Sequence, residues 1–207
     1  MGKQRDYVLH MLKPIAKKCL GLVCGNHEKV AEKFYDRALY GEIVAGIARY
    51  ADKDPSELIL TTGGFVVMRF QRKVGKSDGD RWPFSVYCHH GYGGGRLAGG
   101  HALTLERALG DVDADVIFMG HRHTRSIAEK IIISAGAGNR QHKTRYRLAA
   151  FIGGYLGAYV NPGKRGATDT YAERIGLPPK HLGTSPLMIK PSKREFVLYT
   201  GNMEGLD

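Results

Sequence analysis

The sequence predicts an α/β protein, because short apolar runs typical of buried strands alternate with stretches of helical periodicity. The chain has 207 residues, of which 43% are hydrophobic and 25% charged, an ordinary composition for a globular protein. Strands buried in parallel sheets are continuous apolar runs, and their alternation with helices is typical of this class. We expect a single domain over residues 1–207, since no repeat, low-complexity segment or linker divides the chain.

The N-terminal quarter predicts two helices with a strand between them. Apolar residues at spacings of three and four predict a helix over residues 3–18, and Pro14 predicts a break near its end. The apolar run at residues 20–24 predicts a buried strand. A second helix is expected over about residues 29–50, with residues 52–55 ending it.

The middle of the chain predicts strands, a loop and a helix. Residues 58–60 and 65–70 are expected to form two strands around a glycine turn. Residues 75–81 are expected to be a polar loop that leads to a strand at 84–87. A helix is predicted at about residues 102–109.

Three further strands are predicted in the last part of the chain. They lie at residues 115–119, 131–133 and 196–199. Between the last two strands, residues 140–147 are strongly basic, and residues 146–160 mix aromatic residues with glycine.

Charge and cysteine content restrict the classes of partner. Lys and Arg number 31 against 20 Asp and Glu, a net charge of +11 that favours polyanions such as nucleic acid or phosphoesters. A surface adapted only for solubility is the alternative explanation of this charge. No apolar stretch is long enough to span a membrane, so no membrane partner is expected. Three cysteines and no secretory signal favour a reducing, cytoplasmic location.

Histidine-bearing motifs directly follow three of the apolar runs. Their sequences are Gly25-Asn26-His27-Glu28, His89-His90-Gly91 and Gly120-His121-Arg122-His123. Loops at the carboxyl ends of strands can meet at one edge of a sheet, so the fold could gather these side chains. A single histidine at a strand end is usually structural, but three such ends are harder to explain in that way. Imidazole and amide oxygen suit divalent zinc, manganese, iron or nickel.

In their order and spacing, these motifs resemble the third, fourth and fifth motifs of the calcineurin-like metallophosphoesterases. The resemblance covers about residues 3–134 and is loose beyond them. It implies a layered α/β/β/α sandwich of mixed sheets. It also implies metal-dependent hydrolysis of a phosphomonoester or phosphodiester, with nucleic acid or a nucleotide as a candidate substrate. In such enzymes two metal ions hold the attacking hydroxide.

The resemblance further implies a role for each matching residue. Asn26, His90 and His121 would bind one divalent ion, and His123 would bind a second. The expected ions are manganese, iron, zinc or nickel. His27 would be the catalytic histidine, which stabilises the transition state or protonates the leaving oxygen.

Two arginines are expected to contact the substrate. Arg96 lies in the glycine-rich loop 91–100, and Arg122 occupies a position where the family often has threonine. Simple solvent exposure is the alternative for Arg122. The loop lacks the Gly-Lys-Ser/Thr ending of a P-loop, so we expect it to form a wall beside the metal site.

The start of the chain departs from the pattern of the family. The family opens with Asp-x-His and Gly-Asp-x-x-Asp motifs, which supply further ligands and a bridging carboxylate, and neither occurs before Gly25. We therefore expect the first strands of the fold to be missing, metal binding to be weak and activity to be impaired. A missing N-terminal segment, or a second chain that supplies it, is an expected partner.

A non-catalytic, basic nucleic-acid-binding protein is the main alternative. Arginine and lysine side chains would contact the phosphates, and tyrosines would stack on the bases. Core packing is the other explanation of the tyrosines. The residues concerned are Lys143, Arg145, Arg147, Lys164, Arg165, Tyr146, Tyr155 and Tyr159.

A structural zinc site is a further alternative. It would consist of Cys24, His27, Cys88 and His90. Zinc-binding cysteines usually occur as closely spaced pairs, and these two are far apart in the sequence, which disfavours this site.

Overall fold

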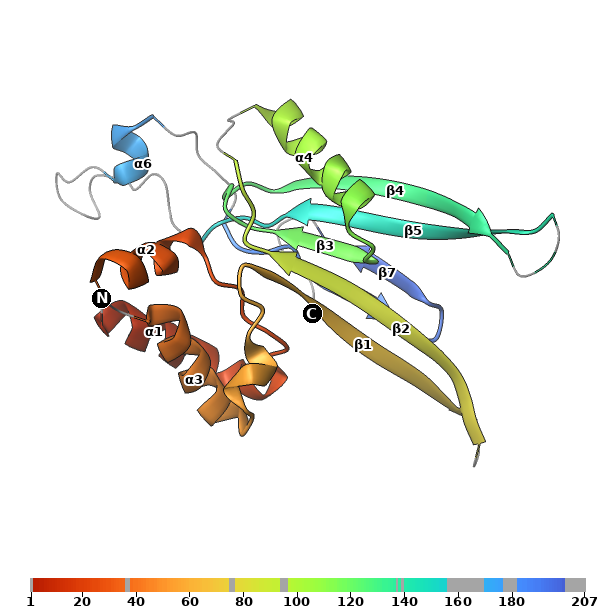
Figure 1. Ribbon diagram of the computed structural model, residues 1–207, viewed down its shortest axis with the longest axis horizontal. Coiled ribbons are helices and arrows are strands. Elements are labelled where there is room, and N and C mark those ends of the chain that lie inside the picture. Colours follow the sequence, from red (N-terminus) through yellow and green to blue (C-terminus); the bar gives the residue numbers. More distant parts are fainter. Residues whose placement is uncertain are drawn as a thin grey trace. The chain divides into compact units, whose positions relative to one another are not determined.

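The protein is a mixed α/β fold, with helices in the N-terminal part of the chain and strands in most of the remainder (Figure 1). The structure is a computed structural model that describes residues 2–35, 38–74, 77–93, 97–136, 138, 140–155, 170–176 and 182–199. The α/β class predicted from the sequence is therefore confirmed. No helix in the described part of the chain combines the length and the apolar character needed to cross a bilayer.

Most of the helices precede the first strand, and most of the later elements are strands. The α-helices are α1 (Gly2–Leu12), α2 (Asn26–Tyr35), α3 (Leu39–Ala51), α4 (Ala98–Asp111) and α6 (Tyr171–Arg174). The 3-10 helices are η1 (Lys13–Lys18) and η2 (Pro55–Leu58). The strands are β1 (Gly63–Val74), β2 (Ser77–His89), β3 (Val116–Met119), β4 (Ser126–Ala135), β5 (His142–Phe151), β6 (Leu187–Lys190) and β7 (Glu195–Leu198). A five-stranded mixed sheet has the order β1-β2-β3-β5-β4, and β6 pairs with β7 in a second sheet.

The chain folds as two compact units. The first contains Met1–Val67 and Ser85–His90, and the second contains Met68–Phe84 and Gly91–Asp207. Strands β1 and β2 each contribute residues to both units. The expected single domain over residues 1–207 stays a prediction.

The helices of the first unit surround a small aliphatic core. Its buried members are Ala16, Val44, Ile47, Ala48, Ala51 and Leu58. The predicted helix over residues 3–18 is α-helical only to Leu12, because Pro14 in the next turn has no N–H with which to continue the hydrogen bonds. The helix expected over 29–50 is in fact two helices, since Ala38 before α3 has a non-helical ψ of 56°.

The strands expected at residues 20–24 and 58–60 were predicted too long. Only a parallel bridge between Leu22 and Ile59 is present, in which the Leu22 N–H donates to the Leu58 carbonyl at 2.7 Å. The capping box of Asp54 starts η2, and this helix holds the chain in helical geometry as far as Leu58.

Pairing of β1 with β2 extends further than the sequence indicates. The polar loop predicted at 75–81 is wrong for residues 77–81, which belong to β2. Aromatic side chains explain the extension, because the Phe70 and Trp82 rings stack at 5.7 Å between centroids.

Strand β3 lies parallel to β5 in the interior of the second unit. Val116 is opposite Leu148 and Met119 is opposite Phe151, and all four side chains are buried. Strand β4 pairs with the other edge of β5 in antiparallel register. Helix α4 packs on β4 and β5 through its buried face. These elements confirm the helix expected near 102–109 and the strands expected at the apolar runs, whereas β6 was not predicted.

We predict that the core of the first unit depends on Ile47. Ile47 is 1% exposed and Ile15 of the same unit is 55% exposed, which makes the two a matched pair. Replacement of Ile47 by Ala should lower the free energy of unfolding by about 2–5 kcal/mol, since it removes buried methyl groups and leaves a cavity. Urea unfolding followed by circular dichroism measures the change. An equal loss for Ile15→Ala would contradict the position of this core.

Candidate functional site

Asn26 and His90 lie in direct contact in the first unit, although 64 residues separate them in the sequence. Asn26 is the first residue of α2, and His90 directly follows β2. The Asn26 Oδ1 and His90 Nε2 atoms are 2.8 Å apart. Two residues that were expected to bind the same metal ion are therefore brought together.

The contact is a hydrogen bond between the amide oxygen of Asn26 and the imidazole of His90. Both groups are of the chemical types that bind divalent manganese, iron, zinc or nickel.

The backbone at Gly25 lies close to the His90 ring. A Cβ atom at Gly25 would lie 3.2 Å from His90 Cε1, which is tighter than most such contacts. The His90 N–H donates to the Thr62 carbonyl at 2.8 Å, which fixes the start of the loop. Glycine before Asn26 thus allows the two motifs to approach each other.

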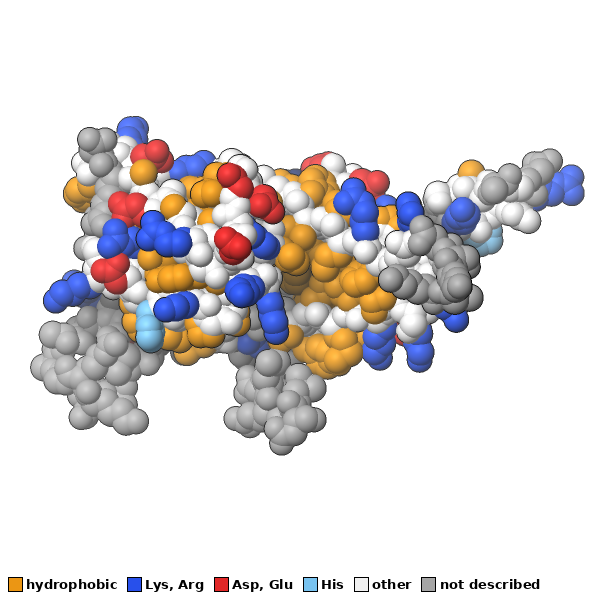
Figure 2. All heavy atoms as spheres, turned by 90° about the horizontal axis from the view of Figure 1, so that it is seen from below, with side chains coloured by type: hydrophobic (Ala, Val, Ile, Leu, Met, Phe, Trp, Pro, Cys, Tyr) orange, Lys and Arg blue, Asp and Glu red, His pale blue; other side chains and the backbone are white. Residues whose placement is uncertain are grey.

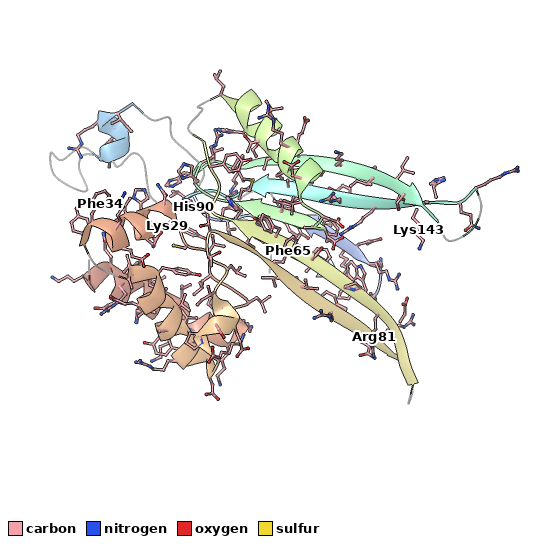
Figure 3. The ribbon with its side chains drawn as sticks, viewed as in Figure 1. Lys29, Phe34, Phe65, Arg81, His90 and Lys143 are labelled. Carbon is pink, nitrogen blue, oxygen red and sulfur yellow. The ribbon has the colours of Figure 1, made fainter. Side chains whose placement is uncertain are left out.

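Lys29 is a candidate site residue that the sequence did not indicate. It lies one turn along α2 from Asn26, and Figure 3 shows it close to His90. Its Nζ donates to Thr62 Oγ1 at 2.5 Å. Burial lowers the pKa of His89, and the charge of Lys29 lowers it further. A basic residue three positions after an expected ligand was the only signal in the sequence.

His27 is exposed on the first turn of α2, next to Asn26. The side chains expected to form the centre are thus divided between the two units. Asn26, His27 and His90 belong to the first unit, and His121 and His123 belong to the second.

The loop after β3 holds both of its histidines in left-handed backbone conformations. The φ angles are 70° at His121 and 50° at His123. The Arg122 N–H donates to the Gly120 carbonyl at 2.8 Å, so His121 is the central residue of a γ-turn with positive φ, a rare and strained form. Strained backbone of this kind concentrates at functional sites, where the surroundings enforce it.

Two glycines allow other segments of the second unit to press against this loop. Gly91 has φ of 93°, and a Cβ atom there would lie 2.5 Å from the Gly120 oxygen. A Cβ atom at Gly154 would lie 3.1 Å from the Cγ and Nδ1 atoms of His123. Glycine is therefore required at position 91, and a side chain at position 154 would force His123 to shift by a few tenths of an ångström.

Arg122 braces the same loop. Its Nε donates to the Tyr92 carbonyl at 3.1 Å, and its guanidinium lies 5.6 Å from the centroid of the Phe151 ring. Simple solvent exposure is therefore not its state, since the side chain is half-buried and its guanidinium makes two contacts. Its role in substrate binding stays a prediction. Arg96, the other expected substrate contact, lies outside the described residues.

No cluster of three or more His, Cys, Asp or Glu side chains suited to a metal occurs among the residues that the structure describes. The alternative zinc site of Cys24, His27, Cys88 and His90 is therefore wrong. The Cys24 Sγ instead donates to the Gly25 carbonyl at 3.5 Å. Burial raises the pKa of both the Cys24 and the Cys88 thiols, which disfavours the thiolate form that binds zinc.

Two of the arginines expected to bind nucleic acid are engaged within the protein. Arg145 pairs with Asp113 at 2.7 Å and with Asp115 at 2.9 Å. Arg147 is buried, and its Nε donates to the Ala114 carbonyl at 2.7 Å. These internal contacts reduce the number of cations that β5 offers to a phosphate backbone.

The other residues of the nucleic-acid alternative vary in their surroundings. Lys143 is exposed on β5 (Figure 3). Burial and a hydrogen bond with Glu129 raise the pKa of Tyr146 to about 12. Lys164, Arg165 and Tyr159 are not among the described residues. In Figure 2, Lys and Arg side chains are spread over the visible face among hydrophobic ones.

No family model matches the chain, and comparisons with curated proteins and with solved structures give no match either. The function must therefore be inferred from the chemistry of the site itself.

We predict that the backbone strain at His121 can be measured with two substitutions. His121→Gly and His121→Ala both remove the imidazole, but only glycine adopts positive φ without steric cost. The glycine variant should therefore be more stable than the alanine variant by about 1 kcal/mol. Urea unfolding of both variants gives the difference. Greater stability of the alanine variant would show that His121 is not strained.

We also predict a pH dependence of stability from His89. The folded state lowers the pKa of His89, so the unfolded state binds a proton more readily. This part of the stability is fully present above the unfolded value of about 6.5 and is lost as the pH falls below it. Urea unfolding at several pH values measures the free energy of unfolding. This free energy should fall less steeply with decreasing pH in His89→Gln than in the unmodified protein. The same change at the exposed His10 is the control, and an equal effect there would contradict the assignment.

Proposed function

We propose that the protein is a metal-dependent phosphoesterase of the calcineurin-like type. The contact between Asn26 Oδ1 and His90 Nε2 at 2.8 Å carries the proposal, because the resemblance assigns both atoms to one ion. The resemblance assigns the remaining ligand roles to His121 and His123. The substrate would be a phosphomonoester or phosphodiester, and the net charge of +11 favours nucleic acids and nucleotides among these.

The backbone of the second unit supports the same proposal independently. His121 and His123 both keep positive φ angles in the loop after β3, which costs free energy. A turn that served only to connect β3 to β4 would have no need for two histidines in such conformations. Glycines at the two points of closest approach, Gly91 and Gly154, are expected if the placement of the rings matters.

The proposal includes the layered α/β/β/α sandwich of this enzyme family. A mixed five-stranded sheet supports this arrangement, as do histidine-bearing loops that directly follow β2 and β3. Catalytic groups of α/β proteins commonly occupy such loops.

The metal ions of this family supply a hydroxide nucleophile and neutralise charge that develops on the phosphoryl oxygens. Asn26 and His90 would hold the ion that they share, and the hydrogen bond from the His90 N–H to the Thr62 carbonyl fixes the backbone of this ligand. His27, exposed beside Asn26, would donate a proton to the leaving oxygen. The ammonium of Lys29, fixed by Thr62, would attract the negatively charged substrate.

Uncharged ligands limit the strength of such a centre. Imidazole and amide groups leave the positive charge of the ion unbalanced, whereas a bridging carboxylate would offset part of it. We therefore expect weak metal binding and slow turnover.

We predict that manganese binding and hydrolysis respond differently to two substitutions. His90→Ala should abolish both, because it removes a metal ligand. His27→Asn should keep manganese binding but reduce the turnover of bis(4-nitrophenyl) phosphate by about 100-fold or more, as expected for a lost general acid. Calorimetric titration with manganese and release of nitrophenol measure the two effects.

His142→Asn on β5 is the matched control and should change neither quantity, since His142 is exposed and lies outside the proposed site. Absence of manganese binding by the unmodified chain, or hydrolysis that persists in EDTA, would overturn the proposal. Binding of nucleic acid that weakens steeply with salt and needs no metal would then favour the non-catalytic alternative.

A further inference from the structure

The second unit contains a cavity of about 440 Å³ that the proposed metal centre does not use. It lies between the paired strands β1 and β2 and the turn that joins β6 to β7. Its lining includes the aromatic side chains of Phe70 and Trp82 and the guanidinium groups of Arg72 and Arg194. Cavities of about 300–1,000 Å³ with apolar walls and a few polar groups are typical of small-molecule sites.

The aromatic wall of the cavity is rigid. The Phe70 and Trp82 rings are stacked, with centroids 5.7 Å apart and planes inclined by 30°. Trp82 also meets the edge of Phe84 at 5.3 Å, and Phe84 is fully buried against Phe196 at 5.1 Å. The core thus holds the indole in place, and the cavity has a preformed flat apolar surface.

Cations lie beside this surface. Side chains two positions apart in a strand point to the same face, so Arg72 shares a face of β1 with Phe70. Arg194 forms an ion pair with Asp80, which joins the β6–β7 turn to β2. Arg72 is exposed and forms no ion pair within the part of the chain that the structure describes. Arg72 is therefore the side chain available to an anionic ligand.

We infer that this cavity binds a nucleotide, with the base stacked on the Phe70 and Trp82 wall and the phosphate paired with Arg72. Aromatic rings bind bases of any sequence because every base has a π-face. An arginine guanidinium matches phosphate oxygens in charge and in geometry. A purely apolar ligand would leave Arg72 unused, and a simple anion would leave the aromatic wall unused.

A free mononucleotide and a nucleotide within single-stranded nucleic acid both offer a base for stacking and a phosphate for Arg72. The inference does not depend on the proposed metal centre, since none of the cavity residues belongs to the expected ligand set. Binding can therefore be tested in EDTA, where failure of the metal centre has no effect on the result.

The test uses the fluorescence of Trp82, the only tryptophan of the chain. Adenosine monophosphate should quench this fluorescence in a saturable manner in EDTA. Adenosine, which lacks the phosphate, and ribose 5-phosphate, which lacks the base, should each bind about tenfold more weakly or worse. If a short oligoadenylate binds more tightly than the mononucleotide, the ligand is single-stranded nucleic acid. If the two bind equally, the ligand is the free nucleotide.

Variants separate the two parts of the site. Arg72→Gln should weaken binding of adenosine monophosphate by about tenfold and leave binding of adenosine unchanged. Phe70→Leu should weaken binding of both ligands. Arg107→Gln on α4, an exposed arginine of the same unit, is the matched control and should change nothing.

Three results would overturn the inference. The first is the absence of quenching by both adenosine monophosphate and the oligonucleotide. The second is equal binding of adenosine and adenosine monophosphate together with no effect of Arg72→Gln. The third is binding of ribose 5-phosphate as tight as that of the mononucleotide.

Discussion

The parallel pairing of β3 with β5 is the constraint on which the second unit depends. Because Met119 lies opposite Phe151, the chain leaves both strands at the same edge of the sheet. The Ile152 N–H then donates to the Met119 carbonyl at 2.9 Å and continues the alignment past the strand ends. The segments that carry His123 and Gly154 consequently start side by side, which explains why a glycine faces a histidine there.

The loops at these strand ends combine unfavourable backbone conformations with close packing. Positive φ at His121 is disfavoured in isolation, so neighbouring contacts must maintain it. Arg122 contributes by holding the Tyr92 carbonyl and the Phe151 ring. In the first unit, Asn26 at the start of α2 contacts His90 directly after β2. The lack of a side chain at Gly25 leaves room for this contact.

Sequence patterns predicted the elements whose signals are local and missed those that tertiary partners determine. The apolar run of β3 and the periodicity of α4 are local signals, and both elements were predicted. Residues 77–81 look like a polar loop, but stacking of Phe70 on Trp82 extends the strand through them. Motif order predicted the contact of Asn26 with His90. No pattern could predict the anchoring of Arg122, because its partner is a backbone carbonyl, which has no signature in the sequence.

The division of the chain into two units has a consequence for the order of folding. The first unit consists of residues 1–67 and 85–90, and the segment between them, residues 68–84, belongs to the second unit. During synthesis the helices around Ile47 can pack early, because their core is complete by Leu58. His90, however, joins Asn26 only after the ribosome has made part of the second unit. The expected metal ligands of the first unit, Asn26 and His90, therefore meet only after its helices have packed.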